Sequence, residues 1–290
     1  MKRLKPSLAF IFLVMPCTLL AAFTYYPAIM SVISSFWNQG TSRRPSKFVG
    51  LENYQALLND DSLVQILLNN VLYALVTIPV SIALSIAMAL LVNSKIKGTS
   101  LMRLSFFLPT MLPMIAVANI WLFIYAPGIG FISQVMQYFG FAPINFLGDT
   151  DTSLWSMIVV TIWKESGLFM IFYLAALQTV PTNLKEAARI EGASATRIFF
   201  DVVMPLLRPT TIFVAVNALI NSFRLIDHVI VMTEGGPNNS SSLLLYYIYE
   251  VTFKYRDFAY GSTLTVFMVT LLGLLALFQF KVLDRKAHYQ

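Results

Sequence analysis

Ionisable side chains interrupt two long apolar stretches of this sequence. Lys164 and Glu165 lie in one stretch, and Arg224, Asp227 and His228 lie in another. Groups of these types can transfer protons, hold a metal ion or guide a polar solute. A charged side chain is costly at membrane depth and usually faces a cavity or a partner. These residues are therefore the first candidates for chemistry or for a translocation path.

Metal and acid–base catalysis are poorly supported by the rest of the composition. The sequence has only 2 His, of which His288 lies near its end, and its 1 Cys allows neither a thiol cluster nor an intrachain disulfide. We expect no metal site, no catalytic residue and no cofactor in this chain.

Two interpretations of the second charged group stay open. Arg224 precedes Asp227 by three residues and His228 by four, so the three would share one face of a helix. They would either face a path or neutralise one another locally. If the solute carries a phosphate, Arg224 or Lys164 is the expected cation.

Uncharged polar side chains in the apolar stretches suit a hydroxylated solute. Asn119, Trp121, Asn217 and Asn221 offer hydrogen-bonding groups and an aromatic plane. Asn217 and Asn221 share nearly one helical stripe with Arg224. Hydrogen bonds between helices explain buried asparagines equally well, so the sequence leaves both roles open.

The elements that must position these residues are membrane spans. Hydrophobic residues make up 57% of the chain and charged residues 12%, with a mean hydropathy of +0.71, whereas about a quarter of a soluble domain is charged. Residues 82–92 are apolar without the alternation of a β-barrel strand. Because a span needs roughly 20 apolar residues, we predict an all-α polytopic bundle in one transmembrane domain, 1–290. Its six spans are residues 8–31, 64–92, 104–125, 154–177, 211–232 and 263–280.

The net charge of +6 follows this topology and does not indicate nucleic acid binding. By the positive-inside rule, the excess of Lys and Arg on one side predicts that both termini are cytoplasmic. The first apolar stretch is too long for a signal peptide, so we expect it to be retained as a span. The basic residues on the predicted cytoplasmic side are Lys2, Arg3, Lys5, Lys95, Lys97, Arg103, Lys185, Arg189, Arg197, Arg208, Lys281, Arg285 and Lys286. Those on the other side are Arg43, Arg44, Lys47, Lys254 and Arg256.

Residues 181–209, between the fourth and fifth spans, predict a pair of short helices, which we call the knob. Thr182 or Asn183 can cap the first helix, and Gly192 can end it. Ser194 can cap a second helix, which Pro205 ends or sharply bends. Polar and small residues would face outward, where the knob could seat in the groove of a partner.

The spacing of residues in the knob resembles the signature loop of permeases from binding-protein-dependent ABC importers. That pattern has Glu-Ala-Ala, then Gly four positions later, and a hydrophobic-x-hydrophobic-Pro ending. Glu191 replaces the Asp of many sugar-type members, a mild departure. The matching residues are Glu186, Ala187, Ala188, Gly192, Val202, Met204 and Pro205. The resemblance to the sugar-type branch continues through 48–54, 175–181, 233–237 and 245–249, and the tail, 278–290, is similar to the glycerol-3-phosphate branch.

This resemblance implies the knob's role. It implies that the knob inserts into a cleft of an ATPase and transmits closure of that subunit to the spans. Glu186 would meet polar or cationic groups, and Gly192 would set the turn. Glu191 would lie at the same contact. Ala187, Ala188 and Ala193 would allow close packing.

The resemblance also implies an assembly in the bacterial cytoplasmic (inner) membrane. Its partners would be a second, unequal permease chain, two ATPase chains that bind ATP and Mg²⁺, and an external solute-binding protein. The sequence has no G-x-x-x-x-G-K-[ST] phosphate loop, so we expect ATP hydrolysis in a partner chain and no enzyme activity here. The solute would be a carbohydrate, a polyol or a glycerol-3-phosphate-type compound. The alternatives are a self-contained secondary transporter or channel and, less well supported, a membrane enzyme.

Overall fold

The structure is a computed structural model that describes residues 6–40, 45–94 and 96–284. Several residues used above lie outside these ranges: Lys2, Arg3, Lys5, Arg43, Arg44, Lys95, Arg285, Lys286, His288 and the last part of the tail. The described chain divides into two compact units. The first is residues 1–61 with 248–271, and the second is residues 62–247 with 272–290.

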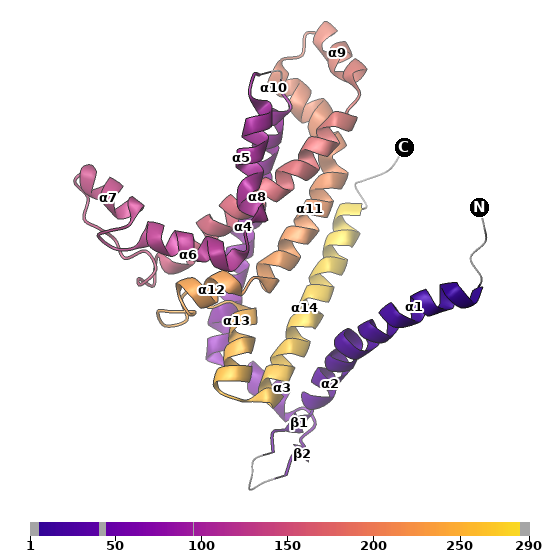
Figure 1. Cartoon of the computed structure of the whole chain (residues 1–290), viewed down its shortest axis with the longest axis vertical. Helices are drawn as coiled ribbons and strands as arrows, with labels where there is room; N and C mark the ends of the chain where they lie inside the picture. Colours follow the sequence, from indigo (N-terminus) through magenta and orange to yellow (C-terminus); the bar gives the residue numbers. More distant parts are fainter. Residues whose placement is uncertain (1–5, 41–44, 95, 285–290) are drawn as a thin grey trace. The chain divides into compact units, whose positions relative to one another are not determined.

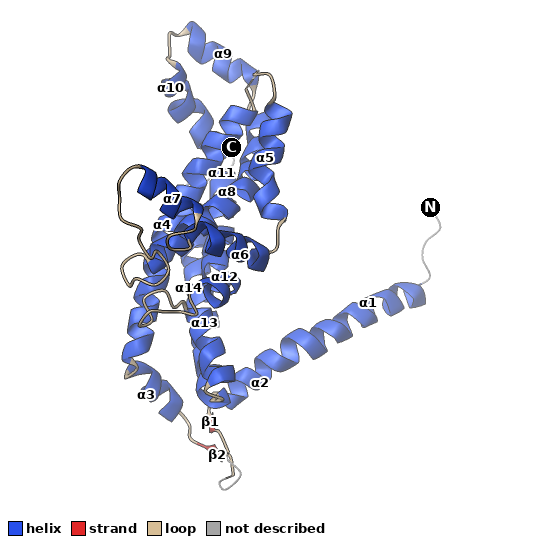
Figure 2. Ribbon diagram, turned by 60° about the vertical axis from the view of Figure 1, so that its left-hand side comes forward, coloured by secondary structure: helices blue, strands red, loops and turns tan. Residues whose placement is uncertain are grey.

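The chain is mostly helical, as predicted (Figures 1 and 2). The described residues hold five helices long and apolar enough to cross a membrane, or six if one bent pair counts as a span. The five are 12–34, 61–92, 153–179, 195–224 and 258–278. Each of them overlaps a predicted span.

The first unit begins with a continuous helix. It comprises α1 (Pro6–Leu20), a π-helical turn (Ala21–Tyr25) and α2 (Tyr26–Ser34). No residue between 12 and 34 is buried. Exposed apolar side chains along a helix are the arrangement expected where lipid is the solvent. The other elements of this unit are β1 (Trp37–Asn38), β2 (Lys47–Phe48), α3 (Glu52–Leu58), a π-helical turn (Glu250–Lys254) and the first part of α14 (Phe258–Asp284).

Side chains near the start of α3 hold the first unit together. The amide of Asn53 donates to the carbonyl oxygens of Ser35 (2.8 Å) and Trp37 (3.0 Å), and the hydroxyls of Tyr54 and Ser35 lie 2.7 Å apart. The antiparallel strands β1 and β2 pair Trp37 with Phe48. In α3 the side chain of Leu57 is buried, whereas that of Leu58 is exposed.

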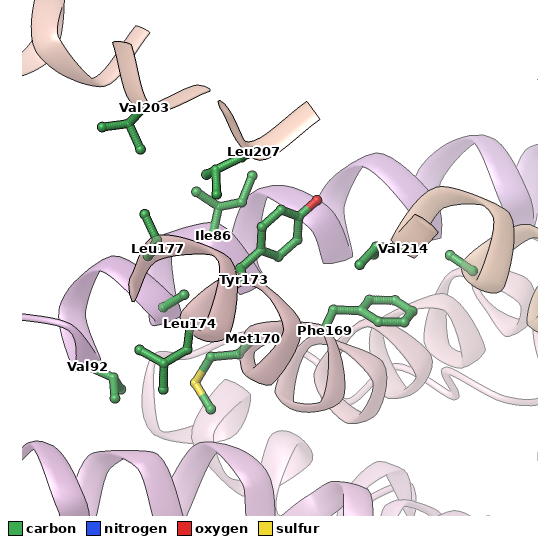
Figure 3. Close-up of a cluster of buried hydrophobic side chains, with 12 residues drawn as sticks. Ile86, Val92, Phe169, Met170, Tyr173, Leu174, Leu177, Val203, Leu207 and Val214 are labelled. Carbon is green, nitrogen blue, oxygen red and sulfur yellow. The ribbon is translucent and has the colours of Figure 1, made fainter. Parts of the chain in front are cut away.

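The second unit carries the other membrane helices and the knob. Its core joins α4, α8 and α11 through apolar side chains that include Ile86, Phe169, Tyr173, Leu207 and Val214 (Figure 3). The elements are α4 (Asp61–Val92), α5 (Thr99–Met111), α6 (Met114–Tyr125), α7 (Phe131–Tyr138), α8 (Ser153–Thr179), α9 (Thr182–Ile190), α10 (Ala195–Ile198), a π-helical turn (Phe199–Val203), α11 (Met204–Arg224), α12 (Asp227–Met232) and α13 (Leu244–Tyr249).

The predicted third span, 104–125, is broken. Between α5 and α6 the chain bends by 102° away from a straight span. Pro113 has no N–H to continue the hydrogen-bond ladder, and it disfavours helical geometry at Leu112, whose ψ is 139°. The predicted third span therefore corresponds to a bent pair of helices, which counts as one span only if α5 and α6 are taken together.

The predicted fifth span, 211–232, also differs from the structure. The helix begins much earlier, at Ala195, and ends at Arg224. Leu225 is extended, with ψ of 111°, and the short helix α12 starts afresh at Asp227. Because Leu225 and Ile226 are ordinary helix-compatible residues, the local sequence carries no signal for this break.

Candidate functional site

The knob joins the ends of α8 and α11 (Figure 1). In α9, no residue is buried. Glu186, Ala187, Glu191 and Gly192 are exposed, and Ala188 and Ala193 are half-buried. In the described part of the chain, no hydrogen bond or ion pair engages the Glu186 side chain. The predicted contact residues therefore lie together on a surface that the chain itself leaves uncovered.

The turn between α9 and α10 is fixed by backbone hydrogen bonds. Gly192 has φ of +81°, and its N–H donates to Arg189 O at 3.0 Å, while Ala193 N–H donates to Ala188 O at 2.9 Å. This pair of bonds is the Schellman arrangement, in which a left-handed residue satisfies the last carbonyls of a helix. The prediction that Gly192 ends the helix is confirmed.

The two predicted caps have different outcomes. Ser194 Oγ accepts a hydrogen bond from Arg197 N–H at 3.3 Å, which confirms it as a cap. The first helix, however, is preceded by Pro181, and the side chain of Asn183 bonds only to the next N–H, that of Leu184. The cap predicted at Thr182 or Asn183 was wrong, because Thr182 and Asn183 already lie within the helix.

Pro205 does not end or sharply bend the second helix. Residues 195–224 form one continuous helix, and a π-helical turn at Phe199–Val203 lies immediately before the proline. The wider turn accommodates a residue that lacks an N–H and whose ring would clash with an α-helical carbonyl. The second arm of the knob is therefore one rigid rod with α11.

Buried side chains anchor this rod in the bundle. Val203 and Leu207 belong to the apolar core shared with α8 and α4, and Phe199 packs against it (Figure 3). Two apolar side chains of α9 have no such partners: Leu184 is 44% exposed and Ile190 is 88% exposed. Sequence reasoning did not assign a role to Ile190, although an apolar residue just before a predicted helix end is a recognisable signal.

Lys164 and Glu165 point to different partners. The Lys164 ammonium donates to the carbonyl oxygens of Leu112 (3.0 Å) and Thr110 (3.3 Å) at the end of α5. Glu165 Oε2 accepts a hydrogen bond from Asn221 Nδ2 of α11 at 3.0 Å. Glu165 and Asn221 also line a cavity of about 10 Å³ with Thr77, Ser81 and Ser222. A space of this size suits about one water molecule.

Arg224, Asp227 and His228 do not share a helical face, so that prediction was wrong. The break at Leu225 separates Arg224, which is exposed, from His228, which is fully buried. A hydrogen bond joins His228 Nε2 to the hydroxyl of Tyr73 at 3.1 Å. Within the described residues, Arg224 and Asp227 form no ion pair. Local neutralisation of these charges is therefore absent.

The remaining predicted path residues are dispersed. The amides of Asn119 and Asn217 each donate to a carbonyl one turn earlier in their own helix, Ile115 O and Phe213 O, at 2.8 Å. Trp121 stacks edge-on against Trp163 with ring centroids 5.7 Å apart. Among the predicted path residues, Glu165 and Asn221 are joined by a side-chain hydrogen bond in the described structure.

A larger cavity lies where the 127–151 loop meets the segment after α12. Its volume is about 660 Å³, and its lining includes Tyr125, Asn145, Thr233, Glu234 and Pro237. Part of its wall is a turn in which Gly236 N–H donates to Thr233 O at 2.9 Å. Sequence reasoning did not find this cavity, because its walls come from segments far apart in the chain.

Buried asparagines were also missed. Asn70 is fully buried: its Oδ1 accepts from Leu244 N–H at 2.6 Å, and its Nδ2 donates to Ser222 O at 3.4 Å. The neighbouring Asn69 donates to Asn239 O and Ser242 O. These amides hold the segment between α12 and α13 against α4. The acceptor and donor sites come from segments far away in the chain, so no local pattern predicts them.

Comparisons with known proteins agree with this architecture. The chain is 33% identical to the sulfoquinovosyl glycerol transport system permease protein SmoG of Agrobacterium fabrum over 267 residues, which cover 91% of this chain and 86% of the relative. It is 29% identical to the sn-glycerol-3-phosphate transport system permease protein UgpA of Pectobacterium atrosepticum over 283 residues, covering 96% and 95%.

The fold is that of a solved transporter chain. A crystal structure of a bacterial ABC transporter involved in the import of the acidic polysaccharide alginate contains a chain that superposes with a TM-score of 0.87 at 18% identity, covering 97% of this chain and 96% of the other. Residues 56–289 match the family described as "Binding-protein-dependent transport system inner membrane component". The chain therefore belongs to this family, as a non-catalytic, multi-span permease component of an ABC importer in the inner membrane.

Proposed function

We propose that this permease transmits ATP-driven motion from a separate ATPase to a solute path through the surface formed by Glu186, Ala187, Ala188, Glu191, Gly192 and Ala193. The supporting observation is a rigid knob whose functional face has no partner within the described chain. Its turn is fixed by the Schellman bonds, and its second arm continues into α11. Force applied to the knob would therefore move a membrane helix instead of bending a loop.

The proposed assembly contains a second, unequal permease chain, two ATPase chains and an external solute-binding protein. ATP and Mg²⁺ would be held by the ATPases, since the sequence contains no phosphate loop. A second transporter structure that superposes with a TM-score of 0.85 is a bacterial alginate ABC transporter in complex with alginate pentasaccharide-bound periplasmic protein. This precedent supports delivery by a binding protein. We also propose that both termini of the present chain lie on the cytoplasmic side, because the excess of Lys and Arg favours that orientation.

The proposed path takes a carbohydrate, a polyol or a glycerol-3-phosphate-type solute. Relatives are named for sulfoquinovosyl glycerol, sn-glycerol-3-phosphate and multiple sugars, all of which are hydroxylated compounds. Amides, carboxylates and aromatic rings provide suitable hydrogen bonds and stacking surfaces. The candidate path residues are Asn119, Trp121, Lys164, Glu165, Asn217, Asn221, Arg224 and Asp227.

A self-contained secondary transporter or channel is the rival function. Such a protein would use intramembrane charges without an ATPase and would have no need of an uncovered knob. The membership of this chain in the importer family and the geometry of the knob both favour the coupled importer.

ATP hydrolysis by the assembled complex in lipid tests the coupling role. We expect the solute-binding protein, loaded with solute, to stimulate hydrolysis in the wild type, and Gly192→Val or Glu186→Ala to abolish the stimulation. Gly98→Val is a matched control, because Gly98 also has positive φ (+92°) and open space around its Cβ position, as Gly192 does. Unchanged stimulation of ATP hydrolysis in both knob variants would contradict the coupling role and favour the secondary transporter instead.

A further inference from the structure

The ammonium of Lys164 forms hydrogen bonds to carbonyl groups at the end of α5, where the third span is broken. Its Nζ donates to Leu112 O at 3.0 Å and to Thr110 O at 3.3 Å, and Thr110 Oγ1 donates back to Lys164 O at 3.1 Å. Three hydrogen bonds thus join one residue of α8 to the point at which the third span bends.

The carbonyl groups at this bend need donors from outside their own helix. The last carbonyls of any helix lack intrahelical partners, and Thr110 O and Leu112 O lie at the end of α5, where the helix is interrupted at the extended residue Leu112. At membrane depth water is scarce, so an unsatisfied carbonyl is expensive. A cation also suits the negative end of the helix dipole. Lys164 meets both requirements at the position where the ladder is interrupted.

Neighbouring residues of α8 hold the two arms of the bend. Gly167 lies so close to α5 that a Cβ atom there would collide with Phe106 O. Trp163 packs edge-on against Trp121 of α6. Within five residues, α8 therefore contacts the arm before the bend, the bend itself and the arm after it.

We propose that Lys164 is a positioning residue that keeps the third span broken, and that it is not the counter-ion of an anionic solute. By holding the bend, it sets the direction of α6 and so the places of Asn119 and Trp121. This inference replaces the candidate path role of Lys164 with a structural one, and rests on the proposed function only in treating Asn119 and Trp121 as path residues. If the solute is anionic, side chains other than Lys164 then bind its charge.

Distances between spin labels on the two arms test this role. The full-length chain, with Cys17→Ser, would be assembled with its partner subunits in lipid nanodiscs and labelled at Leu104 of α5 and Ile120 of α6, both exposed. We expect Lys164→Met to lengthen and broaden the distance distribution, because the freed carbonyls favour a straighter span. Lys164→Arg should restore a distribution close to wild type, since guanidinium also donates to carbonyls.

Two further variants keep the test decisive. Glu165→Gln changes the adjacent charge without touching the bend, and should leave the distribution as in the wild type. If Lys164→Met does not assemble, Lys164→Gln retains a shorter neutral donor and should give an intermediate broadening. A wild-type distribution in Lys164→Met or, failing that, in Lys164→Gln would overturn the proposal. The measurement needs neither solute nor nucleotide, so its outcome is independent of the coupling experiment.

Discussion

The knob and the polar cluster inside the bundle use similar residues in opposite ways. In the knob, Glu186 and Glu191 are exposed, and no other part of the described chain covers the face that carries them. In the bundle, Asn70, Glu165 and Asn221 bond to other helices or loops of the same chain. The free polar surface belongs to the proposed partner contact, whereas the buried groups first of all hold the architecture.

This difference cautions against assigning every intramembrane polar residue to the solute path. A buried amide or charge must be satisfied wherever it lies, and the nearest carbonyl or carboxylate in the same protein often does so. Changes in the cluster should therefore reduce the stability of the chain, while changes on the exposed face of the knob should cost little stability and impair assembly or coupling. Four experiments test this contrast, in decreasing order of their expected effect on stability.

Asn70→Leu should have the largest effect. The nearly isosteric leucine leaves the buried N–H of Leu244 without its acceptor, which costs roughly 1–3 kcal/mol. Reversible unfolding of the purified chain in mixed micelles with increasing SDS would measure the loss. Asn119→Leu is the control, since Asn119 is exposed and bonds only within its own helix; its change should stay within about 0.5 kcal/mol. Equal losses would remove the distinction between the two asparagines.

The contact between Glu165 and Asn221 should have a smaller effect. A double-mutant cycle with Glu165→Leu and Asn221→Leu should give a coupling energy of about 0.6 kcal/mol and at most about 1.7 kcal/mol, the range for hydrogen bonds between membrane helices. The same unfolding assay applies. A coupling energy of zero would mean that the two groups act independently, and would favour a role for Glu165 in the solute path over a structural role.

Local patterns in the sequence predict the spans and the knob well. Long apolar runs need a helix in lipid, and Gly192 and Ser194 specify a helix end and a helix start through their own chemistry. The Gly192 turn and the Ser194 cap therefore agree with the structure. The proline at 205 misled the prediction, because a π-helical turn before it absorbs the missing hydrogen bond.

Contacts between distant segments decide the features that the sequence does not reveal. The break at Leu225 has no proline or glycine to mark it. The role of Lys164 depends on α5 ending beside α8, and Pro113 alone does not say whether a span kinks slightly or turns by 102°. Asn70 likewise finds its acceptor and donor more than 150 residues away. Such pairings are properties of the packed bundle, and no window of sequence contains them.

Ser194→Ala should have a small and local effect. The capping bond from Arg197 N–H is long, at 3.3 Å, and exposed. Its loss should cost about 0.5 kcal/mol, the lower end for helix caps. Hydrogen exchange should become faster at residues 195–198 and stay unchanged in α8. Faster exchange across α8 as well would show that the knob is not a separate element.

Ile190→Ser should leave stability unchanged and still impair the complex. Ile190 is 88% exposed, so its removal costs the isolated chain no packing, and its unfolding free energy should stay within about 0.5 kcal/mol of the wild type. If the ATPase buries this side chain, its loss removes about 1.5–3 kcal/mol of burial energy, which is roughly tenfold or more in affinity. Titration of the ATPase onto the permease in nanodiscs measures that affinity.

Leu58→Ser is the matched control for this last variant. Leu58 is also exposed, at 80%, and also lies at the end of a short helix, but on α3 instead of the knob. It should change neither stability nor ATPase affinity. Equal weakening by Ile190→Ser and Leu58→Ser would point to general surface hydrophobicity, and an unweakened Ile190→Ser complex would exclude this end of α9 from the contact. Only a loss confined to Ile190 assigns the uncovered face of α9 to the ATPase, because only that result separates a binding surface from exposed apolar area in general.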